Sequence, residues 1–125
     1  MKARGLLGIL VVLLLLGTVA PALAADTVAR VVVVQTDDVA AYVKEIDKGR
    51  AMLKRLGSSG VLRVWQARFA GDATGSIVVA IEHPSLAALA ADDAKMAADA
   101  EFQAWLKNLG KIRKVVSDSI YTELK

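Results

Sequence analysis

The sequence has no cysteine and a single histidine, His83, in 125 residues. Without cysteine the chain can form no disulfide and cannot be lipid-linked as a lipoprotein. One histidine, no cysteine and no carboxylates at EF-hand spacing do not favour a metal site. Dinucleotide-binding, P-loop and nucleophile-elbow signatures are also missing. The sequence therefore carries none of the common marks of a metal, nucleotide or serine-hydrolase site, and we assign no catalytic residue from it.

An excess of one charge is also missing once the N-terminal segment is set aside. The chain has 16 Lys and Arg residues against 13 Asp and Glu. Lys2 and Arg4 belong to the first 24 residues, which carry no acid, so the remainder has 14 basic and 13 acidic residues and a net charge of +1. No basic stripe is interleaved with aromatic residues, and we therefore expect no nucleic-acid partner.

Residues 1–24 have the three parts of a secretory signal peptide. Lys2 and Arg4 precede an apolar run from Leu6 to Ala20, and Pro21-Ala22-Leu23-Ala24 supplies a small-x-small cleavage site. We expect cleavage after Ala24 and a periplasmic or secreted domain of residues 25–125, without membrane association. The alternative is a retained anchor, because the run is close to the about 20 apolar residues that span a bilayer.

Residues 25–125 alternate between strand and helix patterns. The valine run within 30–35 is typical of a buried strand, and Thr36-Asp37-Asp38 can cap the helix that follows it. Ser85 and Asp99 can cap two further helical pieces. The expected elements are a strand at 30–35, a helix to about residue 56, strands at 61–69 and 76–82 joined by a hairpin at 71–75, helical pieces at 86–98 and 99–112, and a strand at 115–124.

This β-α-β-β-α-β order, with the second helix split, predicts an α+β ferredoxin-like fold. A four-stranded antiparallel sheet would have helices on one face and leave the other face bare. Alternation directs the aliphatic positions toward the helices, among them Leu62, Val79, Val116, Ile120 and Leu124.

The mixed positions would lie on the bare face and are our candidate lumen-binding residues. They are Arg63, Trp65, Phe69, Val78, Glu82, Ser117, Ser119 and Tyr121. This face is too apolar to remain in water, which predicts a two-fold homodimer packed sheet to sheet as a closed barrel. The space between the two sheets is then the expected pocket.

The chain resembles the dimeric α+β barrel superfamily over nearly all of residues 25–125. The resemblance lies in the element order, the Gly71–Gly75 hairpin, the Glu82-His83-Pro84-Ser85-Leu86 helix entry and the Asp99-Ala100-Glu101-Phe102-Gln103-Ala104-Trp105 segment. It is similar in particular to antibiotic-biosynthesis-monooxygenase-like and NIPSNAP-like domains. The superfamily includes cofactor-independent monooxygenases, haem-degrading enzymes and domains of no known activity, so the fold alone does not choose a function.

The resemblance to haem-degrading members is poor at the residues that matter. They use an asparagine on the first strand, a tryptophan and a helix-borne histidine. This sequence offers Trp65, but its one asparagine, Asn108, is in the last helix. We interpret His83 as a partly exposed loop histidine. Cofactor-independent oxygenation would need neither metal nor flavin, and we expect no cofactor.

Three functional hypotheses remain. We favour a non-catalytic domain that binds a small apolar or aromatic ligand, or none. The first alternative is a cofactor-independent monooxygenase-like enzyme acting on an aromatic compound, with Arg63, Trp65, Glu82 and Tyr121 around the substrate. Under the favoured hypothesis Arg63 and Glu82 form a cross-strand ion pair, and Trp65 packs in the dimer interface. The second alternative is an envelope protein that binds a partner through its surface.

Overall fold

The structure is a computed structural model that describes residues 26–125. The expected signal peptide, its cleavage site and the alternative anchor therefore lie outside the described residues. Within residues 26–125 no helix is long and apolar enough to cross a bilayer.

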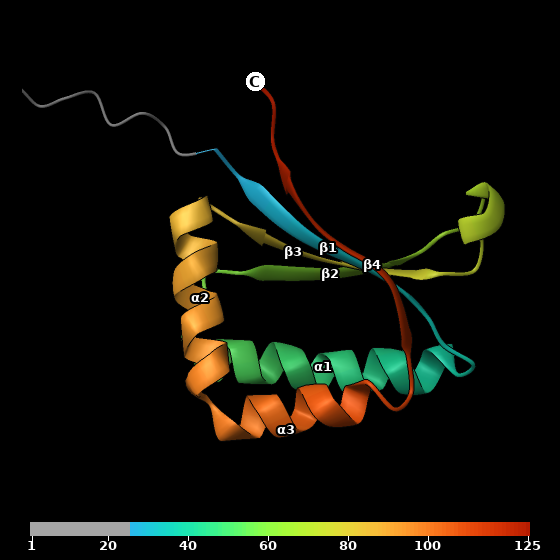
Figure 1. The fold of residues 1–125 in the computed structure, drawn as a ribbon, viewed down its shortest axis with the longest axis horizontal. Coiled ribbons are helices and arrows are strands. Elements are labelled where there is room, and N and C mark those ends of the chain that lie inside the picture. The colour runs from blue at the N-terminus through green and yellow to red at the C-terminus, as the bar shows by residue number, and fades with distance from the viewer. Residues whose placement is uncertain (1–25) are drawn as a thin grey trace, which may run out of the picture.

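Four strands and three α-helices follow one another in the expected order, which confirms the β-α-β-β-α-β pattern with a split second helix (Figure 1). The elements are β1 (Val28–Gln35), α1 (Val39–Arg55), β2 (Val61–Gln66), the 3₁₀ turn η1 (Gly71–Ala73), β3 (Ile77–His83), α2 (Leu86–Ala98), α3 (Ala100–Leu109) and β4 (Lys114–Thr122). The strands form one sheet in the order β2-β3-β1-β4, and every neighbouring pair is antiparallel. This is the ferredoxin-like α+β topology.

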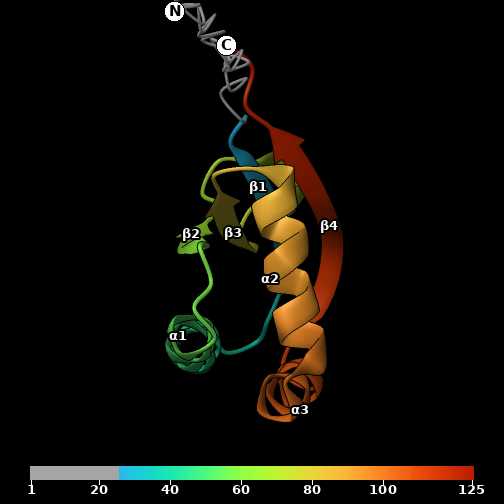
Figure 2. The same ribbon diagram turned by 90° about the vertical axis from the view of Figure 1, so that its left-hand side faces the viewer.

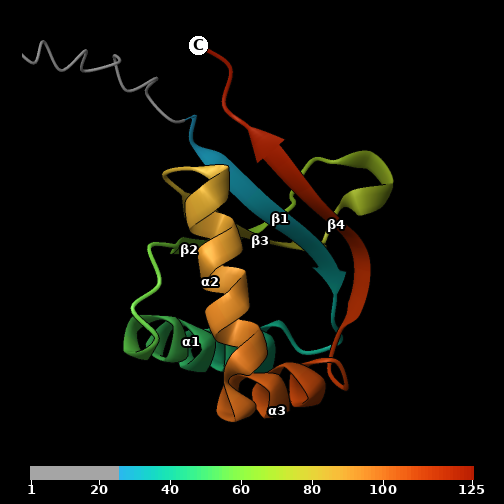
Figure 3. The same ribbon diagram turned by 60° about the vertical axis from the view of Figure 1, so that its left-hand side comes forward.

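All three helices lie on one side of the sheet. Helices α1 and α3 run side by side beneath it, and α2 stands at one end, where it joins the end of β3 to the start of α3 (Figures 1 and 2). No helix covers the opposite face of the sheet, as a turned view also shows (Figure 3). The described chain therefore has one covered face and one open face.

The three expected N-caps are present. The Asp38 side chain accepts from the amide of Ala41, and Ser85 accepts from the amide of Ala88. Asp99 accepts from the amide of Phe102, where the chain turns from α2 into α3. Each side chain satisfies an amide that has no partner inside its helix, which explains why the helices begin at these residues.

The core lies between the sheet and the pair α1 and α3. Its buried members come from both layers and are Val34, Tyr42, Ile46, Ile77, Val79 and Leu109, with a second group of Met52, Leu53 and Phe102. Tyr42 of α1 is fully buried in the first group. Trp105 packs against both groups and links them.

A β-bulge in β4 changes which side chains face the helices. Val33 pairs with Ser117 but Val34 pairs with Val115, so Val116 is an extra residue in the ladder. Strict alternation placed Val115 on the open face, and that expectation was wrong, because the bulge turns Val115 to the helix side. Beyond the bulge the alternation holds, and Ser117 lies on the open face as expected.

Phe69 was expected on the open face at the end of a strand reaching residue 69, which is wrong. The ladder closes at Ala67, whose amide donates to the carbonyl of Ser76 and whose carbonyl accepts from the amide of Gly75. Beyond this point the chain enters a turn, with Gly71 and Gly75 at positive φ. Phe69 lies in that turn and is fully exposed.

The aliphatic side chains of β4 were expected to pack under the helices, which is also wrong. Val116, Ile120 and Leu124 are all more than half exposed. The strand is at the edge of the sheet, and its C-terminal half extends beyond α1 and α3 (Figure 1). Ile120 lies in that half and is therefore left exposed, whereas Val116 is the extra residue of the bulge.

Candidate functional site

An apolar cavity of about 270 Å³ lies between the helix-side face of the sheet and helices α1 and α3. Strand residues form one wall and helix residues the other. The apolar lining consists of Val32, Leu62, Val79, Ile81 and Val115 from the sheet and Ile46, Leu53, Met96, Phe102, Trp105, Leu106 and Leu109 from the helices. We expected the pocket in the space between two sheets, but this cavity is on the other side of the sheet and within one chain.

The helix wall is built around Trp105 and Gly49. A Cβ atom on Gly49 would lie 2.6 Å from Cη2 of Trp105, so only glycine allows the indole to lie this close to α1. The indole Nε1 of Trp105 donates to the carbonyl of Glu45 at 3.2 Å. The centroids of the Trp105 and Phe102 rings are 5.3 Å apart. The space that the missing side chain of Gly49 leaves on α1 is therefore where the indole of Trp105 packs.

Arg30 and Asp118 form a charged pair at the polar side of the cavity. Arg30 Nε and Nη2 donate to the two carboxylate oxygens of Asp118 at 3.0 and 2.8 Å. The hydrogen bond from Arg30 lowers the pKa of Asp118 below its usual value, against the opposing effect of burial, and the charge of Arg113 contributes in the same direction. Asp93 lies 3.6 Å from Arg30.

Arg113 is the second cation of the cavity, and its bonding is incomplete. It lies in the short connection between α3 and β4, with Nη1 donating to the buried hydroxyl of Tyr42 at 3.2 Å. Its Nε is buried and has no hydrogen-bond partner, and among residues 26–125 no other buried side-chain nitrogen or oxygen is in this state. A buried donor without an acceptor is costly, which makes Arg113 the chemically unusual residue of this site.

A second polar cluster lies where the end of β3 meets α2. Asp92 accepts from both hydroxyls of Ser58 and Ser59 and from the Ser59 amide, at 2.8 to 3.0 Å. Its Oδ2 is 3.1 Å from Nδ1 of His83, and both residues are about 3% exposed. The interpretation of His83 as a partly exposed loop residue was therefore wrong. Both residues are buried because His83 is the last residue of β3 and Asp92 of α2 packs against it.

This cluster does not have the geometry of a catalytic triad. Ser59 and Asp92 both approach the same ring nitrogen of His83, and the Ser59 hydroxyl donates to the carboxylate. A triad needs the hydroxyl and the carboxylate at opposite ring nitrogens. Burial raises the pKa of Asp92, and hydrogen bonds from Ser58 and Ser59 more than offset this and bring it below its usual value. The arrangement stabilises a carboxylate rather than activating a nucleophile.

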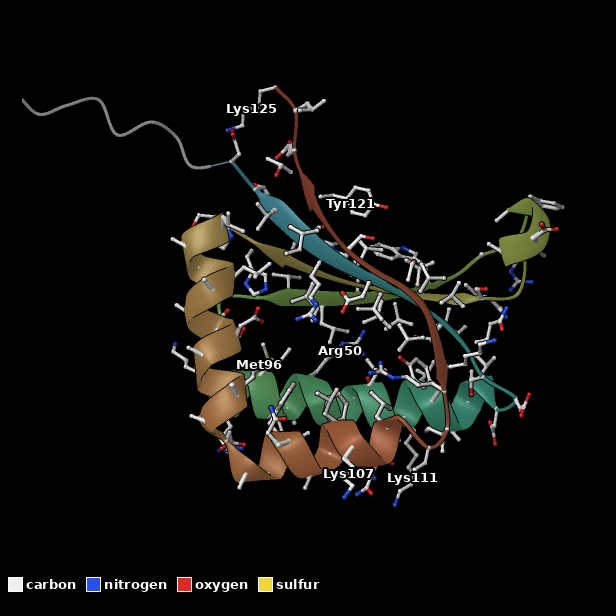
Figure 4. All side chains as sticks on the ribbon, in the orientation of Figure 1. Arg50, Met96, Lys107, Lys111, Tyr121 and Lys125 are labelled. Carbon is white, nitrogen blue, oxygen red and sulfur yellow. The ribbon has the colours of Figure 1, made fainter. Side chains whose placement is uncertain are left out.

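None of the eight candidate lumen-binding residues lines the cavity. Seven of them lie on β2, β3 and β4. Arg63 Nε is 3.8 Å from a Glu82 carboxylate oxygen, so these two form the exposed ion pair that the favoured hypothesis expected. Trp65 is 49% exposed and Tyr121 is 60% exposed, and Tyr121 points away from the helices (Figure 4). A role in lining a lumen between two sheets stays a prediction.

The residues that define the cavity were not among those predicted from the sequence. Arg30 interrupts an apolar strand, and a charge at an inward position was a signal that it faces a partner. Gly49 inside a helix was a second signal. Glycine destabilises a helix interior, so its presence there indicates that a neighbouring side chain packs close to the backbone. Arg113 and Asp118 had no comparable signal, because their roles depend on the bulge and on strand pairing. In residues 26–125 no three side chains of the metal-ligating types come together as a metal site.

Comparisons with known proteins agree with this fold. No protein-family model matches the sequence, and no curated protein matches it. Among solved structures the chain is similar to SnoaB from Streptomyces nogalater, a cofactor-independent oxygenase. The identity is 16% and the TM-score 0.61, over 81% of this chain and 96% of that chain.

Two further structures have the same arrangement. One is a NIPSNAP family protein from Agrobacterium tumefaciens, with 15% identity and a TM-score of 0.59 over 78% of this chain and 91% of that one. The other is a candidate antibiotic biosynthesis monooxygenase from Bordetella bronchiseptica, with 13% identity and a TM-score of 0.55 over 80% and 97%. The chain thus has the ferredoxin-like fold of the antibiotic-biosynthesis-monooxygenase-like and NIPSNAP-like proteins, as the resemblance implied.

Proposed function

We propose that this chain binds a small, largely apolar molecule in the cavity between the sheet and helices α1 and α3. The observation that carries this proposal is the cavity of about 270 Å³, walled by aliphatic side chains and by Trp105. Apolar concave sites with a few polar groups are the usual form of small-molecule sites. The cavity lies within one chain, so binding does not depend on a lumen between two sheets.

Two neighbouring valines of β1 allow a direct test of where the ligand binds. Val32 lines the cavity and pairs with Val79, whereas Val33 pairs with Val78 on the open face. Val32→Phe should fill the cavity and abolish binding of an uncharged aromatic probe, naphthamide, measured by isothermal titration calorimetry. Val33→Phe adds the same ring on the opposite face and should leave the affinity within about twofold.

The reverse result would locate the site between two sheets. If Val33→Phe abolished binding and Val32→Phe did not, the lumen between two sheets would be the site. Arg63, Trp65 and Tyr121 would then be the residues expected to contact the bound molecule. If naphthamide and smaller uncharged aromatics gave no heat with the unmodified chain, the binding proposal would fail and a surface role would gain support.

A cofactor-independent monooxygenase-like activity is the second candidate function. SnoaB, a cofactor-independent oxygenase, has this fold, and the apolar walls of the cavity would shield a reactive intermediate from water. Such an enzyme also needs a group to assist deprotonation of the substrate. Asp118 is the one carboxylate that lines the cavity, and Arg30 occupies both of its oxygens. We therefore place binding ahead of catalysis.

We further propose that a second copy of the chain covers the open face. Val78 lies on that face beside Trp65, its partner on β2, and several apolar side chains there are half exposed. Two such faces packed together would remove this apolar area from water. Val78→Lys should convert a dimer to a monomer in sedimentation velocity, whereas Ala40→Lys, on the exposed side of α1, should not.

The proposal that the chain is exported rests only on the signal-peptide pattern of residues 1–24. We propose that residues 1–24 direct the chain out of the cytoplasm and are removed. N-terminal sequencing of the protein recovered from the periplasm or medium should begin at Ala25. A chain that retains Met1 and sediments with the membrane would instead support the anchor.

A further inference from the structure

We propose that the ligand is an organic anion, an apolar carboxylate whose acidic group pairs with the guanidinium of Arg113. This inference rests on the proposed function, because it names the class of molecule that the same cavity would bind. Three observations carry it: an unpaired donor, the net charge of the lining, and the absence of a competing acceptor among the described neighbours.

The unpaired donor is the first observation. Arg113 lines the cavity, and its Nε is buried without a partner although its Nη1 is held by Tyr42. Buried donors in native proteins are nearly always satisfied, and one that is not calls for a ligand, an ion or a water. Because the Tyr42 hydroxyl is fixed inside the core, the guanidinium is anchored in place before any ligand arrives.

The charge of the lining is the second observation. Two arginines, Arg30 and Arg113, and one acid, Asp118, are the charged residues among those that line the cavity, which leaves a net charge of +1. A charge in an apolar environment is costly unless it is paired. A monoanionic ligand would neutralise the lining, whereas a neutral ligand would leave the excess charge beside its apolar body.

The absence of a competing acceptor is the third observation. Asp118 is the obvious internal partner for Arg113, but both of its oxygens already accept from Arg30 in a bidentate pair. Asp93 is also paired with Arg30, at 3.6 Å. The positive charge of Arg113 is therefore felt by Asp118 without a hydrogen bond between them. A carboxylate from outside the protein would supply the missing acceptor, with the charge-assisted geometry that guanidinium groups favour.

The experiment compares acids with their uncharged amides. Calorimetry at pH 7, where the acids are ionised, measures the affinity of the protein for benzoate, naphthoate and decanoate. Each affinity is compared with that for the matching amide: benzamide, naphthamide or decanamide. We expect the best-fitting acid to bind about tenfold or more tightly than its amide, as a hydrogen bond to a charged group implies. Arg113→Met should abolish this preference while leaving the affinity for the amide within about twofold.

Two controls separate the possible causes. Arg30→Met removes the other cation and should leave a clear preference for the acid, because Arg30 is already satisfied by Asp118. Arg113→Lys keeps a positive charge but not the Nε donor, and should retain only part of the preference. Circular dichroism of each variant checks that it is folded, and the comparison of acid with amide on the unmodified chain does not require any variant.

Each outcome decides the proposal. If acids and amides bind the unmodified chain equally, the cavity binds apolar molecules but the anion proposal is wrong, and a water satisfies Arg113. If the preference survives Arg113→Met and disappears in Arg30→Met, the assignment to Arg113 is wrong. If neither acids nor amides bind, the proposed function itself fails.

Discussion

Two polar clusters lie between the sheet and its helices, and they differ in how completely their hydrogen bonds are made. Asp92 is buried under α2 and accepts from two hydroxyls and an amide, with His83 beside it. Arg113 is half-buried against the cavity and leaves Nε without a partner. The carboxylate of Asp92 thus has hydrogen-bond partners within the protein, whereas Arg113, which lines the apolar cavity, has one nitrogen without a partner.

The difference separates a cluster that we expect to stabilise the fold from one that we propose binds a ligand. A buried charge whose partners are complete stabilises the contact between the elements that supply them, here the α1–β2 loop, β3 and α2. A buried donor without a partner stabilises nothing until something accepts from it. We therefore expect changes in the first cluster to alter folding, and changes in the second to alter binding.

The largest effect is expected for Asp92→Ala. It leaves the Ser58 and Ser59 hydroxyls and the Ser59 amide without their acceptor, and should lower the free energy of unfolding by about 3 kcal/mol. Urea unfolding followed by circular dichroism measures it. Asp93→Ala is the matched control: this neighbouring acid is half-exposed and makes one long contact with Arg30, so the loss should be under about 1 kcal/mol.

Acid should remove part of the same stabilisation. Because the pKa of Asp92 is lower in the folded chain than in the unfolded chain, its contribution is complete above about pH 4. The contribution is lost as the pH falls through the folded-state value, since the unfolded chain takes up the proton first. The free energy of unfolding between about pH 5 and about pH 2.5 should therefore fall less steeply in Asp92→Asn than in the unmodified chain. Parallel curves would contradict the assignment.

Gly49→Ala should reduce stability by about 1 to 2 kcal/mol, because the new methyl group overlaps the indole of Trp105. The gain in helix propensity offsets part of this loss. Ala51→Gly, at an exposed position of α1, measures that propensity alone. Displacement of Trp105 should also weaken ligand binding. If Gly49→Ala were stabilising and bound naphthamide normally, Trp105 would not form the cavity wall.

The smallest effect is expected for Tyr42→Phe. It removes one hydrogen bond to Arg113 and should lower the free energy of unfolding by about 1 kcal/mol. Because Arg113 is then less firmly placed, its preference for acids over amides should decrease without disappearing. Tyr121→Phe, on the open face, should change the free energy of unfolding by less than about 0.5 kcal/mol and leave that preference unchanged.

Much of the fold could be predicted because its signals are local. The caps at Asp38, Ser85 and Asp99 bond to amides three residues away, and periodic apolar positions identified the helices. The end of β2 and the position of Val115 could not be predicted in this way. A bulge in β4 and the closure of the hairpin at Ala67 depend on partner strands, and alternation along one strand cannot detect them.

The site was predicted poorly for the same physical reason. Arg30 and Asp118 are 88 residues apart in the sequence and meet only because β1 and β4 are neighbours in the sheet. His83 was interpreted as a partly exposed loop histidine, yet α2 packs over it and buries it. A side chain's burial and partners depend on the elements that surround it, and no local pattern records them.

The element order, the helix caps, the hairpin and the apolar character of both sheet faces can all be read from the amino-acid sequence. These follow from hydrogen bonds and periodicities that act over a few residues. Three other properties depend on the tertiary structure. The cavity lies on the helix side of the sheet, the carboxylate of Asp92 has its hydrogen-bond donors, and Nε of Arg113 has no acceptor. Those properties depend on which distant side chains the sheet and helices bring within hydrogen-bonding distance.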